Sequence, residues 1–401
     1  MNNLKIIGTH DANTIAQAEN CVQKGLHAGR VIDGANHFVL SADGHYGFCH
    51  PVGGIAAYED YISLAGVGPD AACGNLAIKL DMSEKDLRLN INSILDDIES
   101  NISFGMGRKN NHKVEHELFD DPLWNNEFLK DIKKVAIESL GTVGGGNHYV
   151  DLFADEEELV WIGVHFGSRG FGFKMAQKFL KAAGASNNMD DPPALLKAGT
   201  DLGELYIECL ELAGKYAYAG RNWVAEFIGG EILGAAELDR VHNNHNYLWV
   251  EEHFGRKYYV VRKGATPAFP GQRGFVGGSM GDNAVILEGI ESEAAKSNLY
   301  STVHGAGRVM SRTAAKGKTK TNKKTGEVTE TKPLVNKEEL DKWLTEKNVV
   351  VRGGDLDEAP QAYRRLDSVL DYHKDSIRIL HTLRPVGVIM AGPDLYDPYK
   401  D

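Results

Sequence analysis

The chain has 401 residues, a formal net charge of −12 and a pI near 5.7, and 42% of its residues are hydrophobic. This composition is that of a globular protein with a sizeable core, and it excludes a protein coated in positive charge, as non-specific nucleic-acid binders are. No stretch approaches the roughly 18–20 apolar residues of a membrane-spanning helix. Four widely separated cysteines and an N-terminus without a signal-like apolar region predict a reducing, cytoplasmic location.

The first half of the chain is predicted to combine short strands with helices. Up to about residue 80, short apolar runs punctuated by glycine predict brief strands joined by irregular loops. Residues 84–101 have a helical pattern. The apolar run 159–165 predicts a buried strand, and we expect residues 171–183 to form the helix that follows it.

The second half contains one long predicted helix and one long polar segment. Apolar residues recur at helical spacing over residues 204–228, and residues 258–261 are typical of a strand. Residues 315–333 combine lysines with Gly, Thr, Asn and Glu, so we expect an exposed loop there. Without a tandem repeat or a clear interdomain linker, the predicted organisation is a single α+β domain over residues 1–401, with a C-terminal tail at 393–401.

Five segments carry the residue types of a metal or phosphate site: residues 68–74, 144–148, 165–170, 242–246 and 304–308. Imidazoles, thiolates and carboxylates ligate metals where strand ends or glycine-rich turns let their backbones converge. Taken one at a time, each segment has an ordinary interpretation, because a lone histidine is usually structural and Asn-His pairs occur in turns. Spacing alone does not establish that the five segments meet in space.

The order of these segments resembles the RtcB family of RNA-splicing ligases over almost the whole chain. The matching motifs are DGHYG at 43–47 with PVGG at 51–54, residues 68–74, GTVGGGNH at 141–148, HFGSRG at 165–170, HN at 245–246, RKGAT at 262–266, GSMG at 278–281, HGAGRVMSR at 304–312 and DEAPQAY at 357–363. The resemblance implies the RtcB-type fold, an α+β architecture with sheets around a deep central cleft that contains metal.

The resemblance also implies two Mn²⁺ ions. By motif match, Asp70, Cys73 and His148 would hold one ion. The second ion would be held by Cys73, His165 and His245, so that the Cys73 thiolate bridges both. Mixed ligands of this kind select Mn²⁺ only weakly by affinity, and site geometry and metal availability must contribute.

His304 would be the nucleophile that attacks the α-phosphate of GTP, giving a histidine-GMP intermediate. Transfer of the guanylyl group to an RNA 3′-phosphate would then allow attack by a 5′-hydroxyl, and a 2′,3′-cyclic phosphate would first be opened by hydrolysis. The motif positions that imply nucleotide or phosphate binding are Asn147, Asp151, Arg169, Lys263, Ser279, Gly305, Gly307, Arg308 and Arg312. Ordinary surface charge is the alternative interpretation of the cations in this set.

Three positions depart from the family pattern. Asp151 stands where the family usually has the longer Glu that recognises guanine. Residues 388–392 lack the lysine of the family's usual C-terminal tail, for which Lys400 could substitute, and Val261 replaces a common His. The base-recognition positions are therefore the least intact part of the resemblance.

Three functions compete at this point. The first is an active ligase for RNA ends in tRNA splicing or RNA repair, whose need for an activating protein partner stays open. The second is a paralogue that uses another nucleotide, or that carries out metal-dependent nucleotidyl-transfer or phosphatase chemistry. The third is a non-enzymatic RNA-binding or metal-binding role, which the complete set of metal and nucleophile positions argues against. The lysine-rich segment 315–333 is a candidate for local RNA contacts, although charged loops are usually only solvated.

Overall fold

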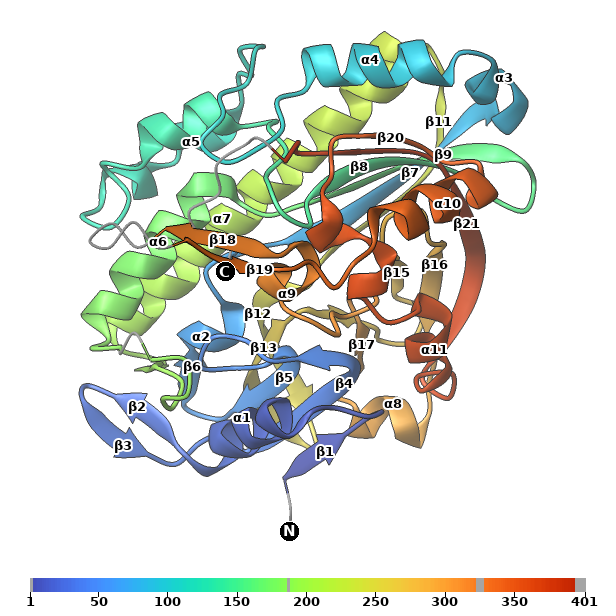
Figure 1. Cartoon of the computed structure of the whole chain (residues 1–401). Helices are drawn as coiled ribbons and strands as arrows, with labels where there is room; N and C mark the ends of the chain where they lie inside the picture. The colour runs from blue at the N-terminus through green and yellow to red at the C-terminus, as the bar shows by residue number, and fades with distance from the viewer. Residues whose placement is uncertain (1–2, 186–187, 322–327, 394–401) are drawn as a thin grey trace.

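Two large sheets form the framework of the computed structural model, which describes residues 3–185, 188–321 and 328–393 (Figure 1). The smaller sheet has five strands in the order β1 (Leu4–Ile6), β4 (His37–His45), β5 (Val52–Tyr58), β13 (Arg256–Lys263) and β12 (Asn246–His253). The larger sheet has eight strands: β11 (Glu237–Asn244), β7 (Gly74–Ser83), β9 (Leu159–Phe166), β8 (Tyr149–Ala154), β21 (Ile377–Met390), β16 (Ala284–Gly289) and β15 (Arg273–Val276) in this order, with β20 (Val350–Arg352) paired to β21.

The larger sheet curls until its two ends almost meet. Asn243 of β11 accepts a hydrogen bond from the Phe275 backbone of β15 at 3.0 Å, and Asn75 of β7 donates to the Phe275 carbonyl at 2.9 Å. These amide side chains substitute for part of a strand-to-strand ladder. They make the sheet near-closed.

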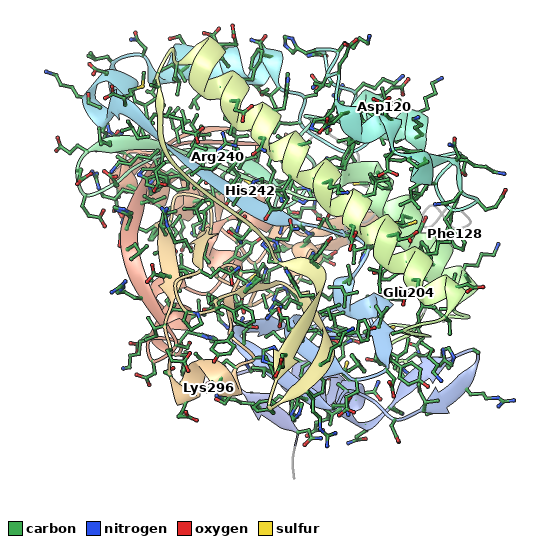
Figure 2. The ribbon with its side chains drawn as sticks, turned by 180° about the vertical axis from the view of Figure 1, so that it is seen from behind. Asp120, Phe128, Glu204, Arg240, His242 and Lys296 are labelled. Carbon is green, nitrogen blue, oxygen red and sulfur yellow. The ribbon has the colours of Figure 1, made fainter. Side chains whose placement is uncertain are left out.

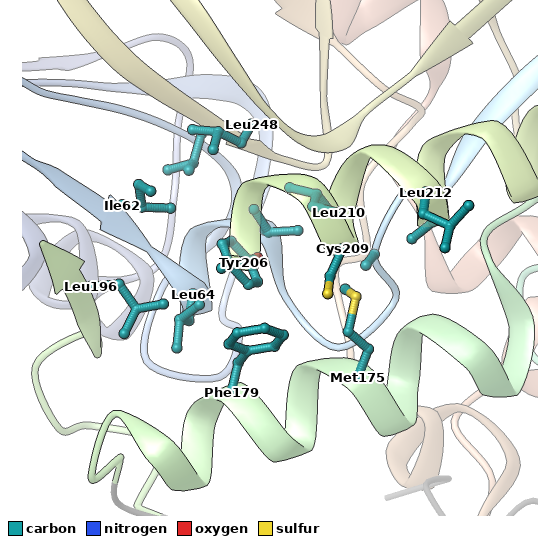
Figure 3. Packing of buried hydrophobic residues seen from close by; sticks show 14 of the residues in the cluster. Ile62, Leu64, Met175, Phe179, Leu196, Tyr206, Cys209, Leu210, Leu212 and Leu248 are labelled. Carbon is teal, nitrogen blue, oxygen red and sulfur yellow. The ribbon is translucent and has the colours of Figure 1, made fainter. Parts of the chain in front are cut away.

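Helices cover the outside of the sheets, with α4 (Ile91–Asn101) at the top in Figure 1 and α5 (Lys133–Ser139), α6 (Arg169–Ala182) and α7 (Asp201–Glu226) on the left. Figure 3 shows how α6 and α7 pack: Met175 and Phe179 of α6 lie against Tyr206 and Cys209 of α7. The long α7 begins at Thr200, whose side chain accepts a hydrogen bond from the Gly203 backbone. No helix in the described ranges has both the length and the apolar character needed to cross a membrane.

The remaining elements are short and connect or flank the sheets. They are α1 (Ala12–Gln23), β2 (Gly25–His27), β3 (Arg30–Ile32), β6 (Tyr61–Ser63), α2 (Leu64–Val67), α3 (Glu84–Leu89), β10 (Leu195–Lys197), β14 (Ala265–Pro267), α8 (Glu293–Ser297), β17 (Ser301–Val303), α9 (Arg312–Lys316), β18 (Lys318–Thr321), β19 (Val328–Thr331), α10 (Lys337–Lys347) and α11 (Leu366–Asp371). The single-turn helices are η1 (Glu117–Asp120), η2 (Pro122–Asn125), η4 (Leu356–Glu358) and η5 (Pro360–Ala362), and the π-helix η3 (Phe227–Ile232) extends α7.

The strongly periodic elements predicted from the sequence are confirmed. The buried strand is β9, the helix after it is α6, the long helix is α7, and the strand predicted at residues 258–261 is β13. The helical segment 84–101 is divided into α3 and α4 by Asn90, which has a non-helical conformation with φ −126° and ψ 19°.

Two predictions were wrong. The N-terminal region was expected to contain only strands and loops, yet it includes α1, for which the side chain of Asp11 accepts hydrogen bonds from two backbone amides of the first turn. The segment 315–333 was expected to be a loop, but it contains the paired strands β18 and β19. Alternating Lys and Thr residues explain the first of these strands, because β-branched threonine favours extended backbone and the alternation matches the two-residue period of a strand.

Candidate active site and metal centre

A cavity of about 590 Å³ has walls from both sheets. The larger sheet contributes residues of β7, β8, β9 and β21, the smaller sheet contributes residues of β4, β12 and β13, and residues 304–312 complete the wall. The predicted site residues that line the cavity are Asp70, Cys73, Asn147, Asp151, His165, His245, Lys263, Ser279, His304, Gly305, Gly307, Arg308 and Arg312. His148 and Arg169 are outside this lining, where they contact each other.

Strand register explains why the distant histidines and the cysteine meet. Cys73 immediately precedes β7, and strand pairing puts the start of β7 beside the ends of β9 and β11. His165 lies near the end of β9, and His245 follows β11. The first residue of β8 pairs with His165, which brings His148, just before β8, to the same place.

The side chains form two groups that share Cys73. In one group, His165 Nε2 lies 3.3 Å from Cys73 Sγ and 3.3 Å from His245 Nε2. In the other, His148 Nε2 lies 2.9 Å from Asp70 Oδ2 and 3.6 Å from Cys73 Sγ. Within each group all ligand atoms lie within 4.8 Å of one another, so each group could hold a metal ion.

Burial sets the electrostatics of the first group. It lowers the pKa values of His165 and His245 well below the ordinary imidazole value, so both rings are neutral and have a free lone pair. A hydrogen bond of 3.0 Å between His165 Nδ1 and the Asn147 carbonyl places the proton on Nδ1 and leaves Nε2 facing Cys73. Burial raises the pKa of the Cys73 thiol, so its thiolate form requires a nearby cation such as a metal ion.

Arg169 determines the tautomer of His148 in the second group. A guanidinium only donates, so His148 Nδ1 must accept from Arg169 Nη1, 3.2 Å away. The ring proton is then on Nε2, which donates to Asp70, and this proton would have to leave before Nε2 could bind an ion. Although burial alone would raise the pKa of Asp70, its electrostatic interaction and hydrogen bond with His148 lower the pKa below its ordinary value.

Glycines make this convergence sterically feasible. A Cβ added to Gly167 would lie 2.3 Å from Asp70 Oδ1, and one added to Gly144 would lie 2.1 Å from His148 Nδ1. The donors themselves are those of divalent metal sites, since neutral imidazoles, a thiolate and a carboxylate suit transition metals. Three donors per group also leave coordination positions for water or substrate. The residues present therefore fit a pair of divalent metal ions.

His304 lies beside the first group and is held by Asp43. Its ring is 5.1 Å from the His245 ring, centroid to centroid, and its Nδ1 lies 2.6 Å from Asp43 Oδ2. The His304 backbone amide donates to the same oxygen at 3.0 Å. Burial alone would raise the pKa of Asp43, but its electrostatic interaction and hydrogen bonds with His304, together with the hydroxyl of Ser41, outweigh burial and lower the pKa to about 2. An ionised Asp43 keeps the ring proton on Nδ1 and leaves the Nε2 lone pair free.

Asp43 is a residue of the candidate site whose contact with His304 the sequence did not predict. It belongs to a motif that resembles the family, but no role followed from its position there. The contact joins residues 261 positions apart, and only the folded chain reveals it.

The predicted phosphate-binding cations are engaged by the protein itself. Lys263 Nζ donates to the carbonyls of Phe48 and His50 at 3.0 and 2.8 Å, and burial lowers its pKa to about 8. Arg312 pairs with Asp357 at 3.0 Å and also contacts Glu358.

Arg308 binds Tyr363 Oη at 2.8 Å, but its buried Nη2 has no hydrogen-bond partner within the described ranges. Gly307 has a φ of +75° and packs so tightly that an added Cβ would lie 2.2 Å from the Asp43 carbonyl oxygen. Gly307 therefore has a structural requirement for glycine that is independent of any phosphate.

Six polar atoms without hydrogen-bond partners among the described residues belong to the cavity lining: Asn75 Oδ1, Tyr149 Oη, Asp151 Oδ1, His245 Nδ1, Ser279 Oγ and Arg308 Nη2. Burial raises the pKa of Asp151 well above its ordinary value. In the sheet, Asp151 pairs with Val388 and Tyr149 pairs with Met390, and both β21 residues line the cavity. An apolar strand thus lies where the family pattern has a lysine.

Val261 and Lys400 are the other positions at which the sequence was compared with the family pattern. Val261 is fully buried in a hydrophobic cluster and does not line the cavity. Lys400 lies outside the residues that the structure describes.

Comparison with known proteins agrees with the motifs. The family profile described as "tRNA-splicing ligase RtcB" matches residues 29–391. The chain is 28% identical to the RNA-splicing ligase RtcB of Escherichia coli K12, over 87% of this chain and 89% of that protein. It is 29% identical to the tRNA-splicing ligase RtcB of Thermococcus kodakarensis, over 87% and 86%, and 27% identical to that of Pyrobaculum aerophilum, over 93% and 91%. The chain therefore belongs to the RtcB family.

Proposed function

We propose that this protein is a Mn²⁺-dependent RNA ligase that uses GTP to join an RNA 3′-phosphate or 2′,3′-cyclic phosphate end to a 5′-hydroxyl end. The observation that carries the proposal is the position of His304. Asp43 holds its Nδ1, and its ring lies beside His245 of one group of candidate metal ligands, which shares Cys73 with the other group. The RNA-ligase names of the relatives support RNA as the substrate.

The two groups would each hold one Mn²⁺ ion, with Cys73 shared between them. When bound, the ions would offset the negative charge that develops on the α-phosphate of GTP. Ions with these ligands would make the cavity the metal-containing cleft expected of the family.

His304 Nε2 would attack the α-phosphorus of GTP. A bond between nitrogen and phosphorus forms, the bond to the β-phosphate oxygen breaks, and pyrophosphate leaves. The 3′-phosphate oxygen of the RNA would then attack the same phosphorus and release His304. Finally the 5′-hydroxyl would attack the activated 3′-phosphate, forming the phosphodiester and releasing GMP. Asp43 would stabilise the charge on the imidazole while the phosphorus is attached, as carboxylates do for catalytic histidines.

The remaining cavity residues would bind the phosphates and the base. The cavity lining that includes His304 also includes polar side chains that would bind phosphate, namely Asn147, Lys263, Ser279, Arg308 and Arg312. Gly305, next to His304, adds no side chain to this lining. Arg169 would act on the metal site, because its guanidinium contacts His148. The segment 315–333 would add local positive charge for RNA, although residues 322–327 lie outside the described ranges.

The direct test is incubation with Mn²⁺ and each α-labelled nucleoside triphosphate, scored for an acid-labile label on the protein. We expect label from GTP, pyrophosphate release, and ligation of RNAs with 3′-phosphate and 5′-hydroxyl ends. Label from no nucleotide would contradict the proposal.

A paralogue with altered base choice is the second candidate function, because Asp151 is one methylene shorter than the family's Glu and its partner on the described strand β21 is Val388, not a lysine. An imperfect pairing of buried polar groups costs on the order of 1–3 kcal/mol. We expect GTP to be preferred, with ATP competing far better than the resemblance implies. In Asp151→Glu, the ratio of labelling rates for GTP and ATP at equal concentration should rise about tenfold.

Asp155→Glu is the matched control for this prediction. It adds the same methylene to a buried carboxylate of the neighbouring turn that lies outside the cavity lining, so the ratio should not change. A wild-type preference for GTP above roughly a thousandfold, or about 4 kcal/mol, would contradict the prediction.

Asp43→Asn tests how the nucleophile is held. An amide can present its NH₂ group to the ring, which favours the wrong tautomer and cannot stabilise a charged imidazole. We expect the rate of adduct formation to fall about a hundredfold or more, with Mn²⁺ binding unchanged. Rapid-quench labelling and metal titration measure the two properties. Asp155→Asn serves as the control, and an adduct rate in Asp43→Asn equal to that of the wild type would refute the role of Asp43.

A further inference from the structure

Arg221 is a fully buried cation near the C-terminal end of α7. Its Nη1 donates to the backbone carbonyls of Ala72 at 3.1 Å and Phe166 at 2.6 Å. Its Nη2 donates to Asn244 Oδ1 at 2.7 Å, and its Nε donates to His242 Nε2 at 2.7 Å. One guanidinium therefore joins the helix to three separate segments of the larger sheet.

Three of the acceptors are each next in sequence to a proposed metal ligand. Ala72 precedes Cys73, Phe166 follows His165, and Asn244 precedes His245. We propose that Arg221 is the positioning residue of the metal centre, which holds these three ligand segments at the spacing needed to bind one ion. This inference rests on the proposed function, because it presumes that the group of Cys73, His165 and His245 binds metal.

The chemistry of the side chain supports a positioning role. Burying a cation is costly unless its donors are satisfied, and no carboxylate forms an ion pair with Arg221 in the described part of the chain. Burial lowers its pKa to about 10, so it is still charged at neutral pH. Its hydrogen bonds are instead made to carbonyls, an amide and an imidazole. A rigid planar fork can serve several acceptors in fixed directions, whereas the single ammonium of lysine cannot.

The helix side of this contact is also fixed. The Tyr218 ring, one turn before Arg221 on α7, stacks on His242 with centroids 3.7 Å apart and planes at 26°. Tyr218 Oη donates to the His242 carbonyl at 3.3 Å. Figure 2, seen from behind, shows α7 running across this face, with His242 on the strand beside it. His242 is thus part of the support for Arg221 and is not a cavity residue.

The contacts are specific to one of the two groups. Within the described ranges, neither Asp70 nor His148 forms a hydrogen bond with Arg221, and His148 is instead contacted by Arg169. Weakening the Arg221 contacts should therefore affect the ion held by His165 and His245 more than the ion held by Asp70 and His148.

Co²⁺ titration of the full-length protein tests the inference, because thiolate-to-cobalt charge-transfer absorption reports ligation by Cys73 independently of catalysis. We expect Arg221→Lys to bind one of the two ions at least about tenfold more weakly, as loss of a group that orients ligands typically does, and to change the absorption of that ion. Asn244→Ala removes one partner of the fork without removing the buried charge, and the same ion should be weakened. If Arg221→Lys does not fold, the metal affinities of Asn244→Ala test the inference.

Asn243→Ala is the matched control. It removes a neighbouring buried amide whose Oδ1 accepts from the Phe275 backbone instead of from Arg221. It should lower the melting temperature without a selective loss of one ion. If the wild type binds two ions, and folded Arg221→Lys and Asn244→Ala bind both ions with the wild-type affinities, the inference about Arg221 is wrong but the proposed metal centre stands. A wild-type protein that binds no ion would overturn the proposed metal centre and the inference together.

Discussion

Replacing His304 with alanine is expected to abolish the covalent nucleotide adduct. The labelling rate should fall by at least about a thousandfold, which corresponds to about 4 kcal/mol of activation free energy. The reason is that Asp43 keeps the proton on Nδ1 and leaves Nε2 as the attacking atom beside the metal ligands. Because His304 belongs to neither ligand group, metal content should not change. Intact-protein mass spectrometry after incubation with GTP and Mn²⁺ measures the adduct, and circular dichroism measures the fold.

His381→Ala is a control for this substitution, since it removes a histidine of β21 that is outside the cavity lining and should leave the adduct intact. If the adduct persisted in His304→Ala, the nucleophile would lie elsewhere. His242, in the histidine-containing segment 242–246, would be one candidate, but its Nε2 accepts from Arg221 and its ring stacks on Tyr218. His45, which lines the cavity with its ring 6.5 Å from that of His304, would be the better alternative.

Replacing Cys73 with serine is expected to weaken the binding of both metal ions by at least about tenfold each. Cys73 is the member shared by the two ligand groups, and a bridging thiolate bonds to both ions, whereas a terminal ligand bonds to one. Calorimetric titration and electron paramagnetic resonance with Mn²⁺ measure the two affinities.

Terminal ligands and a second buried cysteine provide the comparison. His148→Ala and His245→Ala should each weaken mainly one ion, because each belongs to one group. Cys209→Ser removes another buried thiol, which packs in the α6–α7 core, and metal binding should be unaffected (Figure 3). Loss of only one ion in Cys73→Ser would show that the thiolate does not bridge.

The elements that the sequence predicted well are those whose pattern is local. The apolar run of β9 and the helical spacing of α7 extend over many residues, and neighbouring side chains determine both. The predictions failed where the deciding signal was one or two residues. Asp11 at the start of α1 and Asn90 between α3 and α4 are such signals. The Lys-Thr alternation of β18 is equally short, and a polar composition concealed it.

The candidate site divides in the same way. Motif order by itself determined the family, and it named the ligand and nucleophile positions as expectations, because catalytic residue types are retained in ordered motifs that can be read along the chain. Motif match already implied that Cys73 would be shared by two ligand groups, and the structure places it in both. Only the tertiary structure decided that Asp43 holds His304 and that Arg221 contacts the residues next to three candidate ligands. These contacts depend on strand register and on the packing of α7 against the sheet. Such long-range geometry arises from the whole set of interactions in the folded chain, and residue spacing contains no record of it.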